Sequence, residues 1–163
     1  HTAIAVARRV RRRLIIAGNH GDTGEEGRYW EEEVRPHIGA NGIEYAGAVD
    51  DAQKDRLLGG AAAMIVPIEW DEPFGIVFAE ALACGTPVIS CPRGALPEIV
   101  RDGVDGFLVN SEEEACRAVE RLPAIQRRDC RQRAEQTFSA RVVGGQYKKL
   151  YRDLLEAHRP HRS

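Results

Sequence analysis

The sequence has no long apolar run, no closely spaced cysteine pair and no excess of positive charge. A membrane-spanning helix needs roughly 18 apolar residues, and no stretch approaches that length. No secretory signal opens the chain, so no integral membrane segment and a cytoplasmic setting are the default expectations. The cysteines at positions 84, 91, 116 and 130 form no C-x-x-C pair. A zinc site or a disulfide framework is therefore disfavoured.

The charge balance disfavours a nucleic-acid partner. The formal net charge is −2 and the isoelectric point is near 6.2, whereas a protein that follows a phosphate backbone usually carries a basic excess. The local run of arginines over residues 8–13 admits two readings, a phosphate or membrane patch, or a basic helix end that complements the helix dipole. The second reading is the favoured one.

Short apolar runs alternate with helical patterns along the 163 residues, 43% of which are hydrophobic. Strands are expected at residues 14–18, 43–49, 61–68, 87–91 and 107–109. Helices are expected at residues 1–10, 25–38, 53–58, 74–84 and 96–102, after the capping box of Ser111 and Glu114, and through the tail. This alternation predicts an α/β fold, a Rossmann-like doubly wound parallel sheet with helices on both faces.

The stretch EPFGIVFAE places two carboxylates eight residues apart, Glu72 before an apolar helix and Glu80 within it. In open α/β sheets, ligands bind beyond the carboxyl ends of the strands, and this loop directly follows the strand expected at 61–68. Pro73 is expected at or near the first helical position, which leaves the amides of residues 74–76 free to meet a ligand. About 12 Å of helix axis separates the acids, so they are expected to bind two parts of one elongated ligand.

The alternative is that Glu72 is an exposed loop acid and Glu80 a solvated helix residue. Glu80 shares a helix face with Ile76, Ala83 and Cys84, which are small or apolar. A glutamate in such surroundings needs a partner or loses its charge. This requirement favours the functional interpretation.

The segment from Val49 to Val109, which contains P-F-G, A-C-G-T-P-V-I and D-G-x-x-G-F-L-V, resembles the donor-binding half of retaining family-4 glycosyltransferases of GT-B fold. The resemblance implies a nucleotide-diphosphate sugar as donor substrate, with no metal or other cofactor. It implies that Glu72 is the catalytic carboxylate that faces the sugar hydroxyls and that Glu80 binds the ribose. The other donor-binding residues it implies are Phe74, Gly75, Ile76, Val77, Val49, Lys54 and Gly18.

The chain departs from the family pattern at several positions. Many relatives have G-x-G where this chain has Gly18-Asn19-His20-Gly21, and His20 is either a ligand contact or, by preference, a solvated loop side chain. Glu69-Trp70 replaces a common serine and adds an acid beside Asp71 and Glu72. A metal cluster is conceivable there, but a hydrated acidic loop is the favoured reading. Gly94-Ala95 replaces Gly-Gly.

The family implies two further features that this chain lacks. Relatives start this half with a strand that ends near an arginine, and a Lys-Gly precedes the first helix. In a doubly wound order, the absent strand lies between residues 14–17 and 64–67. The chain is therefore expected to be a fragment, with the strand, the two cations and an N-terminal acceptor-binding domain outside it.

The sequence thus predicts a donor-binding domain over residues 1–138 and a C-terminal helix over residues 139–163. The tail helix is expected to pack towards the acceptor-binding domain through Tyr147, Leu150, Tyr151 and Leu154, or else to cover this domain's own core. The main functional hypothesis is glycosyl transfer with retention, the fragment alone being inactive. The alternatives are a nucleotide-sugar binding module without turnover and, ranked lower, a nucleotide-sugar epimerase.

Overall fold

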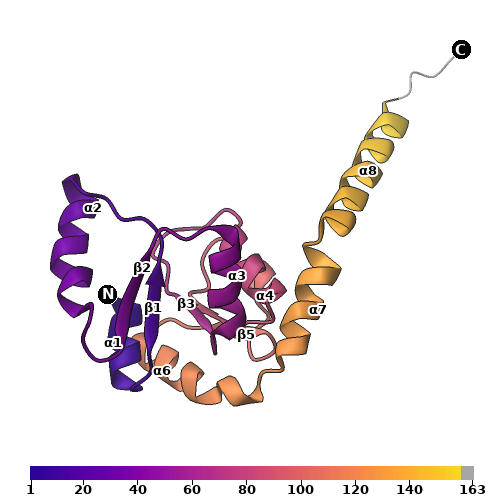
Figure 1. The fold of residues 1–163 in the computed structure, drawn as a ribbon. Helices are drawn as coiled ribbons and strands as arrows, with labels where there is room; N and C mark the ends of the chain where they lie inside the picture. Colours follow the sequence, from indigo (N-terminus) through magenta and orange to yellow (C-terminus); the bar gives the residue numbers. More distant parts are fainter. Residues whose placement is uncertain (159–163) are drawn as a thin grey trace, which may run out of the picture.

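The computed structural model describes residues 1–158 (Figure 1). In chain order, the helices and strands are α1 (Thr2–Arg9), β1 (Leu14–Ala17), α2 (Gly24–Tyr29), β2 (Ile43–Gly47), α3 (Asp51–Gly60), β3 (Met64–Val66), α4 (Ile76–Ala83), β4 (Val88–Ser90), α5 (Leu96–Ile99), β5 (Gly106–Leu108), α6 (Glu112–Arg121), α7 (Arg127–Thr137) and α8 (Ala140–Ala157). This alternation confirms the expected α/β class.

The five strands form two parallel sheets. One contains β1 and β2, and the other has the order β3-β4-β5. Within the part of the chain that the structure describes, β1 and β3 are not paired with each other. A strand from outside the chain is expected at this position.

Helix α1 packs against both hydrophobic cores. Its Val6 belongs to the larger core, which the β3-β4-β5 sheet forms with α4, α6 and α7. Its Ile4 and Ala7 belong to a smaller core with Val34 and Ile43, beneath the β1-β2 sheet. Because apolar burial is the main favourable term in folding, α1 joins the two sheets in the absence of strand pairing between them.

The helix expected over residues 25–38 is not a regular α-helix. Only Gly24–Tyr29 is α-helical, Trp30–Val34 forms a π-helical turn, and Arg35–His37 forms a 3₁₀ turn. Pro36 is the physical reason, because its ring has no N–H to donate and crowds the carbonyl group one turn earlier. The carbonyl groups before it must then find other partners.

Helices α3 and α6 both start with a side-chain cap. Asp50 caps α3, and it forms a reciprocal capping box with Gln53. At α6, the Ser111 hydroxyl accepts from the Glu114 amide, but the Glu114 carboxylate accepts from the amide of Asn110 and not from that of Ser111. The expected capping box at Ser111 is therefore only half formed.

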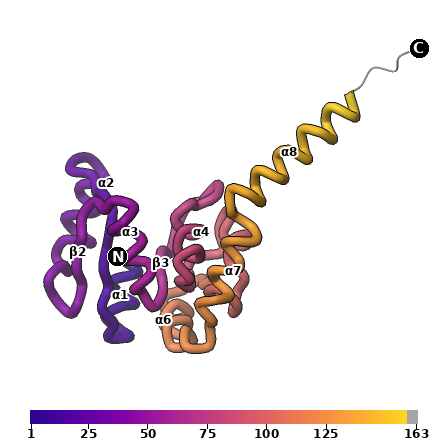
Figure 2. The backbone as a smooth tube through the Cα atoms, turned by 45° about the vertical axis from the view of Figure 1, so that its right-hand side comes forward, coloured from indigo at the N-terminus to yellow at the C-terminus, as the bar shows by residue number. Residues whose placement is uncertain are grey.

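Helix α8 projects away from the rest of the molecule (Figures 1 and 2). Four of its large apolar residues, Tyr147, Leu150, Tyr151 and Leu154, are between 47% and 60% exposed. No residue of this helix is buried. The alternative that these side chains cover the core of this domain is therefore wrong.

Candidate functional site

The loop between β3 and α4 holds most of the sequence-predicted site residues. Helix α4 starts at Ile76, with Gly75 as its N-cap in a left-handed conformation (φ 75°). The expectation that Pro73 lies at or near the first helical position is wrong, because the chain makes this left-handed turn between Pro73 and the helix. The amides of Ile76 and Val77, in the first turn, have no acceptor within the helix.

A side chain at Gly75 would overlap the ring of Phe78, and its Cβ would lie 3.1 Å from Cγ of Glu72. Glycine is therefore required here both for its positive φ and for the close approach of its neighbours. As a result, the Glu72 side chain lies directly beside the start of α4. This is the position from which a carboxylate and two free amides can meet the same ligand.

Glu72 is held through both its side chain and its backbone. Its Oε2 accepts a hydrogen bond from Nε1 of Trp70 at 3.0 Å, and its carbonyl accepts one from the amide of Ala95 at 2.8 Å. A Cβ at Gly94 (φ 53°) would overlap the backbone of Glu72. The loop after β4 therefore supports the loop after β3 through a glycine-to-backbone contact.

Glu80 has the partner that its apolar helix face predicts. Its Oε1 accepts from Nζ of Lys54 at 2.7 Å, and the two side chains are 34% and 27% exposed. Lys54 also lies 3.2 Å from Asp51 on its own helix. The hydrogen bond to Glu80, and secondly that to Asp51, raises the pKa of Lys54, so the lysine is charged at neutral pH.

Three apolar side chains at the start of α4 are exposed. Phe74, Ile76 and Val77 are 43%, 68% and 40% exposed, and Phe74 makes an edge contact with Phe138 at 5.8 Å between ring centroids. Phe74, Ile76 and Glu80 line an open hollow of about 630 Å³ between α3, α4 and α7. Small-molecule sites commonly combine such apolar lining with a few polar groups.

Gly18 and Val49 lie beyond the ends of β1 and β2, in the other sheet. Gly18 has φ 139°, and its carbonyl accepts from the Tyr45 hydroxyl at 2.7 Å. Among the described residues, no hydrogen bond or ion pair links Gly18 or Val49 to Glu72 or Glu80. Both stay predictions for the donor site. His20 stacks on Trp30 with a centroid distance of 4.0 Å.

The acidic loop does not assemble a metal centre within the part of the chain that the structure describes. No group of three or more His, Cys, Asp or Glu side chains there has a metal-binding arrangement. Glu69 is 79% exposed and lies 4.0 Å from the ring of His1. Of the three acids in this loop, Glu69 and Asp71 are exposed and Glu72 is half-buried.

Sequence reasoning missed two residues that hold the site. Trp70 appeared only as a departure from the family pattern, although its position two residues before Glu72 allows the contact. Gly94 was noted only as half of an altered Gly-Gly pair. No sequence signal joins Gly94 to Glu72, because their contact depends on how two loops at the sheet edge pack.

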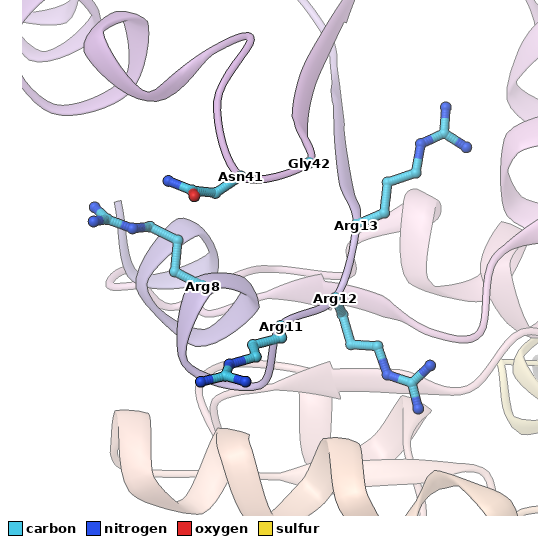
Figure 3. Close-up of a pocket in the computed structure, with 6 residues that line it drawn as sticks. All are labelled: Arg8, Arg11, Arg12, Arg13, Asn41 and Gly42. Carbon is cyan, nitrogen blue, oxygen red and sulfur yellow. The ribbon is translucent and has the colours of Figure 1, made fainter.

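A second hollow, of about 570 Å³, lies near the amino end of β1, at the opposite edge from Gly18 (Figure 3). It is lined by Arg8, Arg11, Arg12, Arg13, Asn41 and Gly42. In Figure 3, Arg8 and Arg11 point to one side, whereas Arg12 and Arg13 point to the other. Arg13 pairs with Glu44 at 2.6 Å. These cations therefore do not converge on one point.

The family model for glycosyl transferases group 1 matches residues 1–137, and the chain belongs to that family. Phosphatidyl-myo-inositol mannosyltransferase of Mycobacterium leprae is 38% identical over 105 residues, which are 63% of this chain and 28% of that protein.

Two solved structures have the same fold. Sucrose-phosphate synthase from Thermosynechococcus elongatus matches with a TM-score of 0.80 and 26% identity, over 96% of this chain and 42% of that one. Anabaena Alr3699/HepE in complex with UDP-glucose matches with a TM-score of 0.74 and 20% identity, over 93% and 44%. The likeness confirms the expected fold of one GT-B half. The chain spans less than half the length of each of these three proteins.

Described residues 1–158 contain no helix that is both long and apolar enough to cross a membrane.

Proposed function

We propose that this chain is the donor-binding half of a retaining glycosyltransferase that moves a sugar from a nucleotide-diphosphate sugar to an acceptor. Family membership supports the transfer of a sugar. The observation that carries the proposal is the half-buried Glu80, which Lys54 holds on the helix that begins beside Glu72. A carboxylate held in place by a neighbouring cation can accept hydrogen bonds from hydroxyl groups.

The proposed roles are those that the resemblance to family-4 glycosyltransferases implies. Glu72, beside the start of α4, receives the hydroxyl groups of the donor sugar. Phe74, Gly75, Ile76 and Val77 supply backbone at the helix start, where the positive end of the helix dipole favours the diphosphate. Glu80 receives the ribose hydroxyls, and Lys54 and Val49 border the base and the diphosphate. Gly18 borders the same edge of the β1-β2 sheet.

In the proposed reaction, the bond between the sugar and the diphosphate breaks on the same face at which the acceptor oxygen bonds to the anomeric carbon. The departing phosphate oxygen takes the acceptor proton. Negative charge develops on the diphosphate, and cations and helix amides stabilise such charge most effectively. No metal takes part in the proposal, so EDTA is expected to leave transfer unchanged.

We propose that the missing parts of the enzyme lie outside this chain. Among the described residues, β1 and β3 each have an unpaired edge, which leaves a place in the topology for one further strand, and a buried strand edge without partners is costly. The same outside residues would supply two cations for the diphosphate and an acceptor-binding domain. A cytoplasmic setting is part of the same proposal.

We propose that α8 packs on that acceptor-binding domain. Tyr147, Leu150, Tyr151 and Leu154 recur at the three- and four-residue spacing of one helix face, and all are exposed. A double substitution Leu150→Glu/Leu154→Glu in the complete protein is expected to lower its unfolding temperature. An unchanged unfolding temperature would contradict this contact.

The test is a thermal-shift screen of the complete protein against uridine, guanosine, adenosine and thymidine diphosphosugars. Because the Anabaena structure contains UDP-glucose, this is the first donor to try. Tighter binding raises the unfolding temperature further, and Glu72→Ala or Glu80→Ala is expected to reduce the shift. A transfer assay then distinguishes an enzyme from a binding module, and epimerised free sugar without acceptor would indicate an epimerase.

A further inference from the structure

Trp70 lies in a loop with three acids, Glu69, Asp71 and Glu72, and its indole N–H bonds to one of them. The acceptor is Oε2 of Glu72, two residues along the chain, at 3.0 Å. Glu69 is 79% exposed and makes its contact with His1 instead. The indole therefore bonds to Glu72, the acid that lies beside the start of α4.

Packing does not explain the presence of a tryptophan here. The Trp70 side chain is 58% exposed, and it belongs to neither hydrophobic core. A large aromatic side chain gains stability mainly by burial, which this one does not use. Its only directional contact among the described residues is the hydrogen bond to Glu72.

The backbone of Glu72 is already fixed from the other side. Ala95 donates to its carbonyl at 2.8 Å, and Gly94 leaves no space between the two loops. The side-chain torsions are thus the remaining freedom of this residue. One hydrogen bond to Oε2 is enough to restrict them, and it leaves Oε1 available to a ligand.

We propose that Trp70 is a positioning residue that orients the Glu72 carboxylate towards the donor sugar. The inference rests on the proposed function, since it assigns Glu72 to the sugar. It predicts that Trp70 contributes to the affinity for the sugar part of the donor and not to the affinity for the nucleotide part. Preorganised polar groups of this kind reduce the ordering cost of binding.

The experiment measures dissociation constants by titration calorimetry on the complete protein. The probes are UDP and UDP-glucose, GDP and GDP-mannose, ADP and ADP-glucose, and dTDP and dTDP-glucose. For each pair, the ratio of the two constants gives the gain in affinity due to the sugar. Trp70→Phe keeps an aromatic ring and removes the N–H, and Trp30→Phe is the matched control at the other tryptophan.

We expect Trp70→Phe to reduce the gain due to the sugar about tenfold, the scale of one hydrogen bond to a charged group, with the nucleoside diphosphate affinity unchanged. Glu72→Gln is expected to cause a similar loss. The double variant is expected to lose no more than either single variant, because the indole acts through the carboxylate. Trp30→Phe should leave the gain unchanged, and Trp70→Phe should leave the unfolding temperature unchanged.

Two outcomes overturn the inference alone: a Trp70→Phe variant that weakens both members of the preferred pair equally, or additive losses in the double variant. A wild-type protein that binds both members of every pair equally overturns the inference together with the proposed sugar role of Glu72. If the wild-type protein binds none of the eight probes, the proposed function fails and the inference fails with it. Trp70→Ala, which removes ring and N–H together, provides a second variant and should lose at least as much as Trp70→Phe.

Discussion

Nζ of Lys54 on α3 lies 2.7 Å from Oε1 of Glu80 on α4, and this ion pair joins two helices across 26 positions of the sequence. Glu80 lies on an apolar helix face, where a half-buried carboxylate needs a counterion, and Lys54 provides it. The pair also fixes the carboxylate at the edge of the hollow between α3, α4 and α7. Glu80 therefore belongs to a structural ion pair and is also the proposed ligand-binding group.

Substitution of Glu80 is expected to weaken donor binding. Glu80→Gln removes the charge that accepts the ribose hydroxyls, so we expect an affinity loss of about tenfold or more, by titration calorimetry with the preferred diphosphosugar. The matched control is Asp153→Asn, which removes another lysine-bonded carboxylate, 2.6 Å from Lys149 on α8. Equal effects of the two variants would contradict the ribose role.

The same ion pair sets an expectation for pH. Because the pKa of Lys54 is raised in the folded protein, its contribution to stability is complete below the ordinary lysine value. It is lost only as the pH rises through the raised value. Unfolding free energies of wild type and Lys54→Met, measured by urea titration from pH 6 to pH 9, are therefore expected to differ by a constant amount. A difference that vanishes within this window would exclude a charged pair.

Gly94→Ala is expected to be strongly destabilising. Its φ of 53° alone disfavours alanine by about 1–2 kcal/mol, and its methyl group would meet the backbone of Glu72. Gly144→Ala is the control, since a Cβ there meets nothing within 4 Å and the residue lies within α8. That change should stabilise the helix by about 0.5–1 kcal/mol. Urea unfolding measures both, and two changes of the same sign would contradict the contact.

Asp105 holds the turn before β5 from a fully buried position. Its Oδ1 accepts from the backbone amide of Arg101 and its Oδ2 from the Arg101 Nε, both at 2.6 Å. Asp105→Asn replaces an acceptor with an N–H₂ group, and we expect a loss of about 1.5–3 kcal/mol in unfolding free energy. Glu31→Gln breaks an exposed bond to Arg35 at the same four-residue spacing and should cost no more than about 0.5 kcal/mol.

The cysteines are expected to differ in reactivity. Cys84 and Cys91 are half-buried, whereas Cys116 and Cys130 are buried, and burial raises the pKa of the Cys130 thiol to about 11. Since the thiolate is the reactive form, a thiol reagent at pH 8 should label Cys84 and Cys91 first and Cys130 only on unfolding. Mass spectrometry of the labelled peptides gives the order. Early labelling of Cys130 would contradict its placement in the core.

Much of the fold is local enough to be predicted. Period and length identify the apolar run at Leu14–Ala17 as a strand, and Ser139 precedes a long amphipathic pattern that is helical from Ala140. The prediction failed where one residue interrupts a pattern from within. Pro36 turns an expected α-helix into π and 3₁₀ turns, and Gly75 delays the start of α4.

The site divides in the same way. The carboxylates of Glu72 and Glu80 were found from their spacing around P-F-G, since a helix start at a sheet edge is defined by residues adjacent in the chain. The sequence predicts that Glu80 has a partner, but it does not identify which residue the partner is. Lys54 was named only through the resemblance, because spacing gives no direct measure of which residue on α3 reaches α4.

The sequence by itself determined the parallel α/β class, the helix start beside Glu72 and the need of Glu80 for a partner, because these follow from burial and chain geometry over a few residues. Only the tertiary structure decided that Lys54 is that partner and that Gly94 supports Glu72. Such contacts join segments that are distant in the chain, and they depend on how helices and loops pack around a shared core.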